Sequence, residues 1–469
     1  MQKLNLSNNK QKGAALIIFA VILVLAATTY LVSQLDATGV KIGRDKKTVA
    51  ALSEAKAALI GYSSSNKRPG ALPCPDTNND GSADTNGNFA CYSNIGRLPW
   101  KTLGLNDIRD GGNERLWYTL SANFANVPST SIINSDDNTG LLNVCPDNTC
   151  GDASPIPALP TIAPLPLLTK QVAIVLSAGN LLSGQDRQDG LDSNPNPVAN
   201  TDNAKKASNY LDNITVGPNQ FNNATGSNNG SDYISSGATD TFNDKLLAIN
   251  SAEAFSNVDK RMQSKATLTE IASCLIEYAQ NNATVNDKRL PWPAPLVLAD
   301  YSNQNNFDDD ATLYTGRIAY QIASSTAKAP IHNWNTGATS KKQKMEYCSN
   351  WPAWWNSWKN YVFYAVSKDF APNTSLLAPQ ICSGNCVTVD GIGPFAALLI
   401  FSGKKLALQT RLSDVDMANP GNFLEDKNAI EITNNSGVGD YTKITNPTQN
   451  DVIICVRQNL TIDTSCSTP

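Results

Sequence analysis

The N-terminal apolar run constrains this chain more than any other stretch. Three lysines and a single glycine, Gly13, precede the run Ala14–Val32, and no charged residue follows until Asp36. As a helix with a rise of ~1.5 Å per residue, the run is about 28 Å long, close to the thickness of a hydrocarbon core. The sequence predicts a helix that spans a membrane to about residue 35. The lysines predict that the leader is cytoplasmic and the rest is exported.

Three interpretations of this run compete. A cleaved secretory signal peptide needs a small-residue cleavage site, and the sequence AATTY at 26–30 fits that requirement poorly. An uncleaved signal anchor needs only the apolar run. A third kind of signal is cut between Gly13 and Ala14, before the apolar segment, so that the helix stays in the mature protein.

The Lys-Gly junction, the apolar segment directly after it and the helical pattern beyond resemble the leader of the type IV pilin and type II secretion pseudopilin superfamily. The resemblance is specific over residues 10–62. It implies that a prepilin peptidase cuts after Gly13 and methylates Ala14. It also implies that the helix sits in the bacterial inner membrane and then packs among other pilin or pseudopilin subunits in a periplasmic or extracellular filament.

One position departs from the family pattern. Major pilins carry a glutamate five residues into the mature chain, where it pairs with the N-terminal amine of a neighbouring subunit, and this chain has Ile18 there. The departure is similar to minor pilins and pseudopilins that sit at a filament tip. It also fits a protein that never enters a fibre.

The helical pattern continues past the apolar run. The apolar residues Val49, Leu52, Ala55, Leu59 and Tyr62 recur at spacings of three to four, which predicts one buried face of a helix. We therefore expect an α+β fold, in which a long helix at 14–64 packs its second half on an antiparallel sheet.

Motifs of the first half recur in the second half in the same order, which is typical of a tandem duplication. The matches are Leu52-x-Glu54 with Leu268-x-Glu270, Leu72-Pro73 with Leu290-Pro291, Gly96-Arg97 with Gly316-Arg317, Trp117-Tyr118 with Phe363-Tyr364, Ser177 with Ser402, Gln185-x-Arg187 with Gln409-x-Arg411, and Asn243-Asp244 with Asn450-Asp451. The predicted organisation is a leader at 1–13, the helix at 14–64, a first pilin-like module at 47–250 and a second at 251–469.

Local patterns predict the elements of these modules. Strands are expected at Leu116–Leu120, Gln171–Ser177 and Lys245–Ile249, and the helix of the second module from about Met262 to Asn281. Residues 187–240 are rich in Asn, Asp, Gly and Ser, which predicts long surface loops.

One loop has the spacing of a calcium site. Asp76, Asn78, Asp80, Gly81 and Asp84 form D-x-N-x-D-G-x-x-D, which offers oxygen ligands at alternate positions and a glycine at the turn. Asp76, Asn78, Asp80 and Asp84 are thus candidate Ca²⁺ ligands. The alternative is a polar turn without an ion.

The ten cysteines predict disulfides, because exported proteins oxidise their cysteines. Proximity in the sequence suggests the pairs Cys74–Cys91, Cys145–Cys150, Cys274–Cys348, Cys382–Cys386 and Cys455–Cys466. The formal net charge of −4 does not favour nucleic acid as a partner.

Motifs of catalysis are absent from the sequence: the one histidine is His332, and there is no nucleophile elbow, HExxH or phosphate loop. Four tryptophans, Trp351, Trp354, Trp355 and Trp358, are either core residues or a binding platform. We expect a non-enzymatic minor or tip subunit that primes assembly or mediates adhesion. A signal-anchored binding protein on the surface or in the periplasm is the alternative, and a calcium-dependent hydrolase is a third class.

Overall fold

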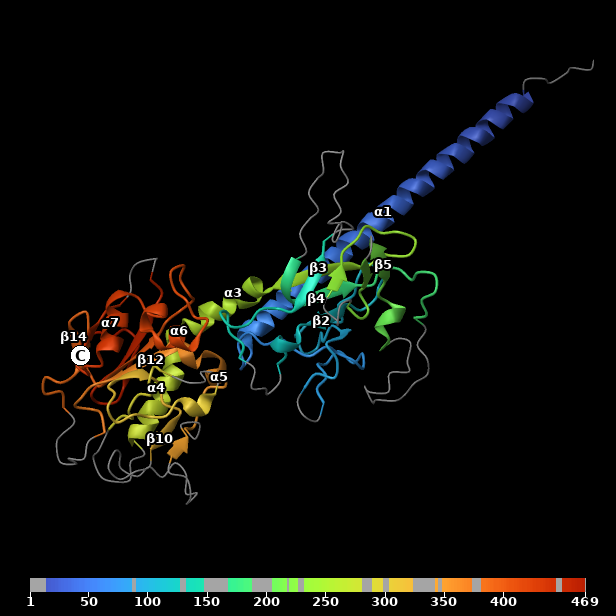
Figure 1. Ribbon diagram of the computed structural model, residues 1–469. Helices are drawn as coiled ribbons and strands as arrows, with labels where there is room; N and C mark the ends of the chain where they lie inside the picture. Colours follow the sequence, from blue (N-terminus) through green and yellow to red (C-terminus); the bar gives the residue numbers. More distant parts are fainter. Residues whose placement is uncertain are drawn as a thin grey trace, which may run out of the picture.

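The computed structural model is an α+β protein in which a long N-terminal helix leads into two modules that each contain a sheet (Figure 1). It describes residues 14–86, 90–126, 132–146, 168–187, 205–216, 219–226, 232–280, 289–297, 303–323, 342–344, 348–372, 381–443 and 449–468. In the first helix, the side chains of residues 19–25 and of residue 38 onward are described.

Helix α1 (Ala14–Ser65) is 52 residues long and projects well beyond the first module (Figure 1). Its second half packs on that module through buried positions three or four residues apart, as expected for one helix face. These positions are Ala51, Leu52, Ala55 and Leu59. The prediction was wrong for Val49, which is 57% exposed.

The predicted membrane-spanning half of the helix is not found, and this part of the predicted fold is wrong. Among the side chains that the structure describes, no helix is both long and apolar enough to cross a membrane.

The sheet of the first module is built around the ten-residue strand β4 (Leu168–Ser177). The strands β2, β3 and β8 pair with β4 in antiparallel fashion, β1 pairs antiparallel with β2, and β7 pairs with β3 in parallel. The bounds are β1 (Ile95–Arg97), β2 (Trp117–Leu120), β3 (Leu142–Cys145), β7 (Asp232–Ile234) and β8 (Lys245–Asn250). The strands predicted from the sequence near β2, β4 and β8 are confirmed.

A separate hairpin joins β5 (Asn213–Val216) to β6 (Asn219–Asn222). Together with β7, this hairpin lies in the segment 187–240 that the sequence predicts to be loop. The prediction was wrong for these three strands, because they are only three or four residues long and lie in an Asn-rich segment, where the alternation of Asn213–Val216 is too short to stand out.

The second module has an antiparallel sheet in the order β18-β17-β15-β12-β9. Its strands are β9 (Thr315–Arg317), β12 (Val362–Val366), β15 (Ala397–Phe401), β17 (Val452–Val456) and β18 (Ile462–Asp463). A smaller sheet contains β13 (Val387–Val389), β14 (Ile392–Phe395) and β16 (Asp440–Tyr441), and a further pair is β10 (Gln321–Ala323) with β11 (Lys342–Lys344). The short helices are α5 (Trp355–Trp358), α6 (Asp414–Ala418) and α7 (Asp426–Asn434).

The central strands of the two modules pair in the same register. Tyr118 lies opposite Gly96 and Val175, and Tyr364 lies opposite Gly316 and Leu399. Each tyrosine hydroxyl donates a hydrogen bond to a proline carbonyl. The distance is 3.2 Å from Tyr118 to Pro73 and 3.1 Å from Tyr364 to Pro291. These shared contacts support the predicted duplication.

Two helices, α3 (Ser251–Met262) and α4 (Lys265–Gln280), follow the first sheet. Helix α3 lies along α1, where Lys56 forms a 2.6 Å ion pair with Glu253 and Arg261 donates to the Ser64 carbonyl at 2.7 Å. Helix α4 covers the second sheet with a buried face that includes Leu268 and Leu275. The helix predicted there is confirmed.

Residues 132–140 of the first module, here called the inter-module loop, contact the second module. Ile133 is buried, and its N–H donates to the Ser357 hydroxyl at 3.1 Å. The Asn134 amide donates to the Ser357 carbonyl at 2.9 Å. One continuous apolar core includes α1, Ile133, α4 and the second sheet. The two modules are therefore packed together rather than joined only by chain.

Candidate functional site

The predicted processing site lies at the edge of what the structure describes. Gly13 falls outside the described residues, and so does His332. Helix α1 begins at Ala14, but the side chains of Ala14 and Ile18 are not among those described. Cleavage after Gly13 and methylation of Ala14 stay predictions.

The candidate calcium ligands lie in one tight turn and face the backbone of that turn. The buried Asp76 carboxylate accepts hydrogen bonds from the N–H groups of Asn79 and Gly81, both at 2.6 Å. The Asp84 carboxylate accepts from the N–H of Thr77 at 2.7 Å. Burial, and next to it the charges of Asp84 and Asp80, raise the pKa of Asp76 to about 6.

These contacts satisfy the carboxylates within the loop. In the described part of the chain, no three His, Cys, Asp or Glu side chains are grouped as metal ligands. Ca²⁺ binding by Asp76, Asn78, Asp80 and Asp84 stays a prediction. To coordinate the ion, the Asp76 carboxylate would have to give up its hydrogen bonds from backbone N–H groups.

The tryptophan cluster belongs to the core of the second module. Trp354, Trp355 and Trp358 are each at most 2% exposed, and Trp351 is partly buried against them. Their rings contact one another and other aromatic rings, and the Trp354 indole donates to Glu270 at 2.8 Å. The binding-platform interpretation is therefore wrong for the three buried rings, because no ligand reaches them.

Four of the five predicted disulfides are present. They are Cys74–Cys91, Cys274–Cys348, Cys382–Cys386 and Cys455–Cys466. Cys150 lies outside the described residues, so its pairing with Cys145 stays a prediction. The bond Cys74–Cys91 closes the segment that holds the candidate calcium loop.

A polar pocket of about 330 Å³, here called the arginine pocket, opens in the first module. Four arginines line it together with one carboxylate, one tyrosine and one amide. The lining residues are Asn79, Arg97, Arg109, Glu114, Arg115, Arg187 and Tyr210. Arg97 comes from β1, and Glu114 and Arg115 lie three and two residues before β2, so the edge of the sheet supplies three of these side chains.

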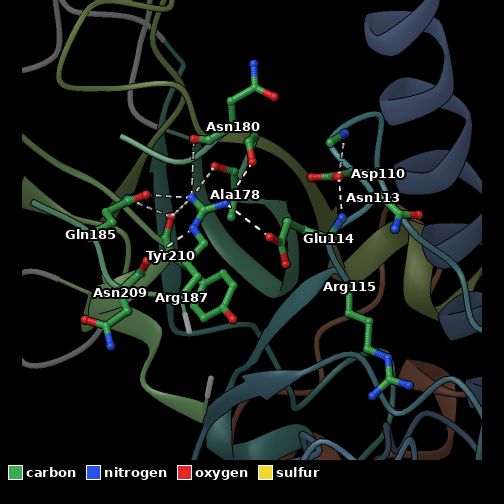
Figure 2. Close-up of polar contacts among 12 residues, drawn as sticks. Asp110, Asn113, Glu114, Arg115, Ala178, Asn180, Gln185, Arg187, Asn209 and Tyr210 are labelled. Carbon is green, nitrogen blue, oxygen red and sulfur yellow. Dashed lines mark hydrogen bonds and ion pairs between the residues drawn. The ribbon is translucent and has the colours of Figure 1, made fainter. Parts of the chain in front are cut away.

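Arg97 and Arg187 form the buried floor of this pocket. The Arg97 guanidinium lies 4.1 Å from the Trp117 ring centroid and 4.0 Å from that of Tyr210. Burial lowers the pKa of Arg97 to about 10, so the side chain remains a cation at neutral pH. Figure 2 shows Arg187 surrounded by backbone carbonyls, with Gln185 on one side and Glu114 on the other.

The contacts of Arg187 fix its guanidinium in place. It donates to the Gly179 carbonyl at 2.9 Å and to the Gln185 side chain at 2.6 Å (Figure 2). Its ion pair with Glu114 is longer, at 3.6 Å. The Arg187 side chain is only 7% exposed, whereas Glu114 is 30% exposed. A buried cation is thus held mainly by neutral oxygens.

The rim of the pocket is more exposed and also basic. Arg109 and Arg115 both pair with Asp107, at 2.7 and 2.8 Å. Figure 2 shows Arg115 pointing away from Arg187, so these two guanidinium groups do not meet at one point. Of the seven described residues that line the pocket, four are arginines and one, Glu114, carries a carboxylate, so the lining is basic.

The second module repeats the floor of this pocket. Arg317 lies 3.9 Å from the Phe363 ring centroid, and Arg411 donates to the Gly403 carbonyl at 3.2 Å and to Gln409 at 2.9 Å. The carboxylate that meets Arg411 is Asp136 of the inter-module loop, at 2.9 Å, and both side chains are almost fully buried. The second site is therefore closed by a residue from the other module.

A pair of acidic side chains lies behind each arginine. Gln185 donates to Asp212 at 2.8 Å, and Asp244 accepts from the Asp212 N–H at 2.8 Å. In the second module, Gln409 donates to Glu425 at 3.2 Å, and Asp451 accepts from the Glu425 N–H at 3.1 Å. Burial, and then the neighbouring carboxylate, raise the pKa of Asp244 and of Asp451 well above the usual range.

The sequence carried a signal for these arginine sites. Gly96-Arg97 with Gly316-Arg317, and Gln185-x-Arg187 with Gln409-x-Arg411, are among the repeated motifs. An arginine that recurs in both copies beside a glycine or a glutamine indicates a shared buried contact. It does not indicate which of the two sites opens to solvent.

Comparison with known proteins gives no relative from which a function can be transferred. No protein-family model, no curated protein and no solved structure matches this chain.

Proposed function

We propose that the protein is a non-enzymatic, pilin-like subunit of a type IV pilus or type II secretion pseudopilus, in a minor or tip position. The observation that carries the proposal is the exposed apolar part of α1. Seven consecutive residues from Phe19 to Leu25 are exposed, and their large side chains are 52–66% exposed. A helix that is apolar on every side is normally buried, so this segment needs a surrounding partner.

The size and arrangement of the head also support the proposal. Two modules packed around a shared core form a bulky head at one end of α1, while the apolar segment lies beyond it (Figure 1). Helices of neighbouring subunits would cover that segment. A head of two modules is awkward in a closely repeating shaft, and Ile18 lacks the carboxylate with which major pilins pair. Both features favour a position at the end of a filament.

Processing of the leader is the first test. The protein is produced with and without a prepilin peptidase, and its intact mass and N-terminal sequence are measured. A mature chain that starts at N-methylated Ala14, and that is lost in the Gly13→Ala variant, supports the proposal. A chain that still starts at Met1 in the presence of the peptidase overturns it and favours the signal-anchored binding protein.

Assembly is the second test. Val24→Asp places a charge in the exposed apolar segment and should abolish recovery of the protein with filament subunits. Leu412→Asp is the matched control, because Leu412 is an equally apolar residue that is 82% exposed on the second module. If Val24→Asp assembles as well as the control, the apolar segment does not make the subunit contact.

A further inference from the structure

We propose that the arginine pocket of the first module is a binding site for a carboxylate supplied from outside that module. The ligand is a compound or an acidic side chain with at least one carboxylate group. The inference goes beyond the proposed function and holds whether or not the chain enters a filament. It rests on the comparison of Arg187 with Arg411 and on the charge of the pocket.

The second module shows which ligand such an arginine takes. Arg411 and Arg187 are held alike, each by a glycine carbonyl and by the side chain of a glutamine two residues earlier. Arg411 also meets the Asp136 carboxylate at 2.9 Å, a distance typical of a strong charge-assisted hydrogen bond. That carboxylate reaches Arg411 from the other module.

Arg187 has no carboxylate as close as 2.9 Å within the described residues. Its nearest carboxylate, Glu114, is 3.6 Å away and partly exposed to solvent. At this distance the two groups make no close hydrogen bond, and water screens the partly exposed Glu114, so the pair contributes little to stability. Glu114 is thus a weak partner that an incoming carboxylate can displace or bind beside.

The shape and charge of the pocket suit an anion. Its floor holds the buried cations of Arg97 and Arg187, and its rim carries Arg109 and Arg115, which are 34% and 22% exposed. The excess of positive charge attracts an anion, and the forked guanidinium groups match the two oxygens of a carboxylate. A volume of about 330 Å³ holds a small dicarboxylate or one acidic side chain with its neighbours.

Binding is tested on the full chain by calorimetric titration with two probes. One is succinate, and the other is a peptide with the sequence of Ile132–Gly140, which carries the Asp136 carboxylate. The proposal expects at least one to bind at low salt, with at least a tenfold loss between 20 and 300 mM NaCl, since salt screens exposed charges. Stronger binding of the peptide identifies an acidic side chain as the source, and stronger binding of succinate identifies a free carboxylate.

Two variants assign the binding to the pocket. Arg115→Gln removes one rim charge without touching the buried floor and should weaken binding about tenfold, while Arg115→Lys should restore most of it. Glu114→Gln removes the competing carboxylate and should strengthen binding. The proposal is overturned if neither probe binds at millimolar concentration or if Arg115→Gln has no effect. It is also overturned if the probes bind no better than their carboxylate-free counterparts, which are succinamide and a C-terminally amidated peptide with both Asp136→Asn and Asp137→Asn.

Discussion

The two arginine sites are built from the same contacts and closed in different ways. In the second module, Asp136 of the inter-module loop lies 2.9 Å from Arg411 and both side chains are buried. In the first module, Arg187 faces a partly exposed Glu114 at 3.6 Å beside an open pocket. The same arrangement of residues therefore forms a buried ion pair between the modules in one copy and lines a solvent-accessible cationic pocket in the other.

The largest expected effect comes from removing the carboxylate of the closed site. Asp136→Ala leaves the Arg411 cation buried without its partner, which should lower the free energy of unfolding by about 3–5 kcal/mol. Glu114→Ala is the matched change at the open site and should cost below about 1 kcal/mol. Urea denaturation of both variants measures the difference. Equal losses would mean that the two sites do not differ as described.

A smaller effect is expected at two glycines that both modules share. A Cβ on Gly96 would lie 2.5 Å from the Asp76 carbonyl oxygen, and one on Gly316 would lie 2.1 Å from that of Ala294. Either alanine variant should lose about 1–3 kcal/mol of stability, because the strand and the neighbouring segment must move apart. Gly237→Ala is the control, since nothing lies within 4 Å of the added carbon. If Gly316→Ala left the stability unchanged while Gly96→Ala lowered it, the two modules would differ at this contact.

The acid pairs predict a pH dependence common to both modules. Burial raises the pKa of Asp244 and Asp451, so the folded chain binds more protons than the unfolded chain. Stability should fall as the pH rises above about 4, the ordinary aspartate value, towards the raised value in the folded state. In Asp244→Asn and in Asp451→Asn, stability should fall less steeply with pH. The midpoint of urea denaturation, measured from pH 5 to 9, tests this. Asp240→Asn, at an exposed position, should leave the slope unchanged.

The smallest change in stability is expected from adding Ca²⁺, and it should depend only on the first module. Ala294 of the second module forms the same backbone pairing with Arg317 as Asp76 forms with Arg97, but it offers no carboxylate. If the calcium prediction is right, Ca²⁺ should raise the melting temperature by a few degrees, and Asp76→Asn should abolish the rise. The rise should shrink below a pH of about 6, because Asp76 is then protonated. A rise that persists in Asp76→Asn would place the ion elsewhere.

Patterns of residue type predicted much of the fold. The strands at β2, β4 and β8 and the helix α4 follow from apolar runs and helical spacing. The motif pairs also fall in equivalent positions, with one correction. Leu176 pairs with Trp117, and Ile400 pairs with the equivalent residue Phe363, so Leu176 and Ile400 are equivalent. Ser177 is therefore equivalent to Phe401, and the prediction that it corresponds to Ser402 was wrong by one position.

The features that could not be predicted from the sequence depend on contacts between residues far apart in the chain. Nothing near Asp136 in the sequence marks it as the partner of Arg411, because 275 positions separate them. Arg187 and Arg411 lie in the same local motif, so only the folded chain shows that one is covered and the other faces a pocket. The tryptophan spacing fits core and platform equally well, and burial alone decides between them.

The contact of α3 with α1 has a mechanical consequence. A force pulling on α1 reaches the second module through the side-by-side helices, where Lys56 meets Glu253 and Arg261 meets Ser64, and in parallel through the inter-module loop. Two connections loaded side by side share the tension, so neither has to stretch alone. The head should therefore move as one stiff body when α1 is pulled, rather than as two modules joined by a flexible linker.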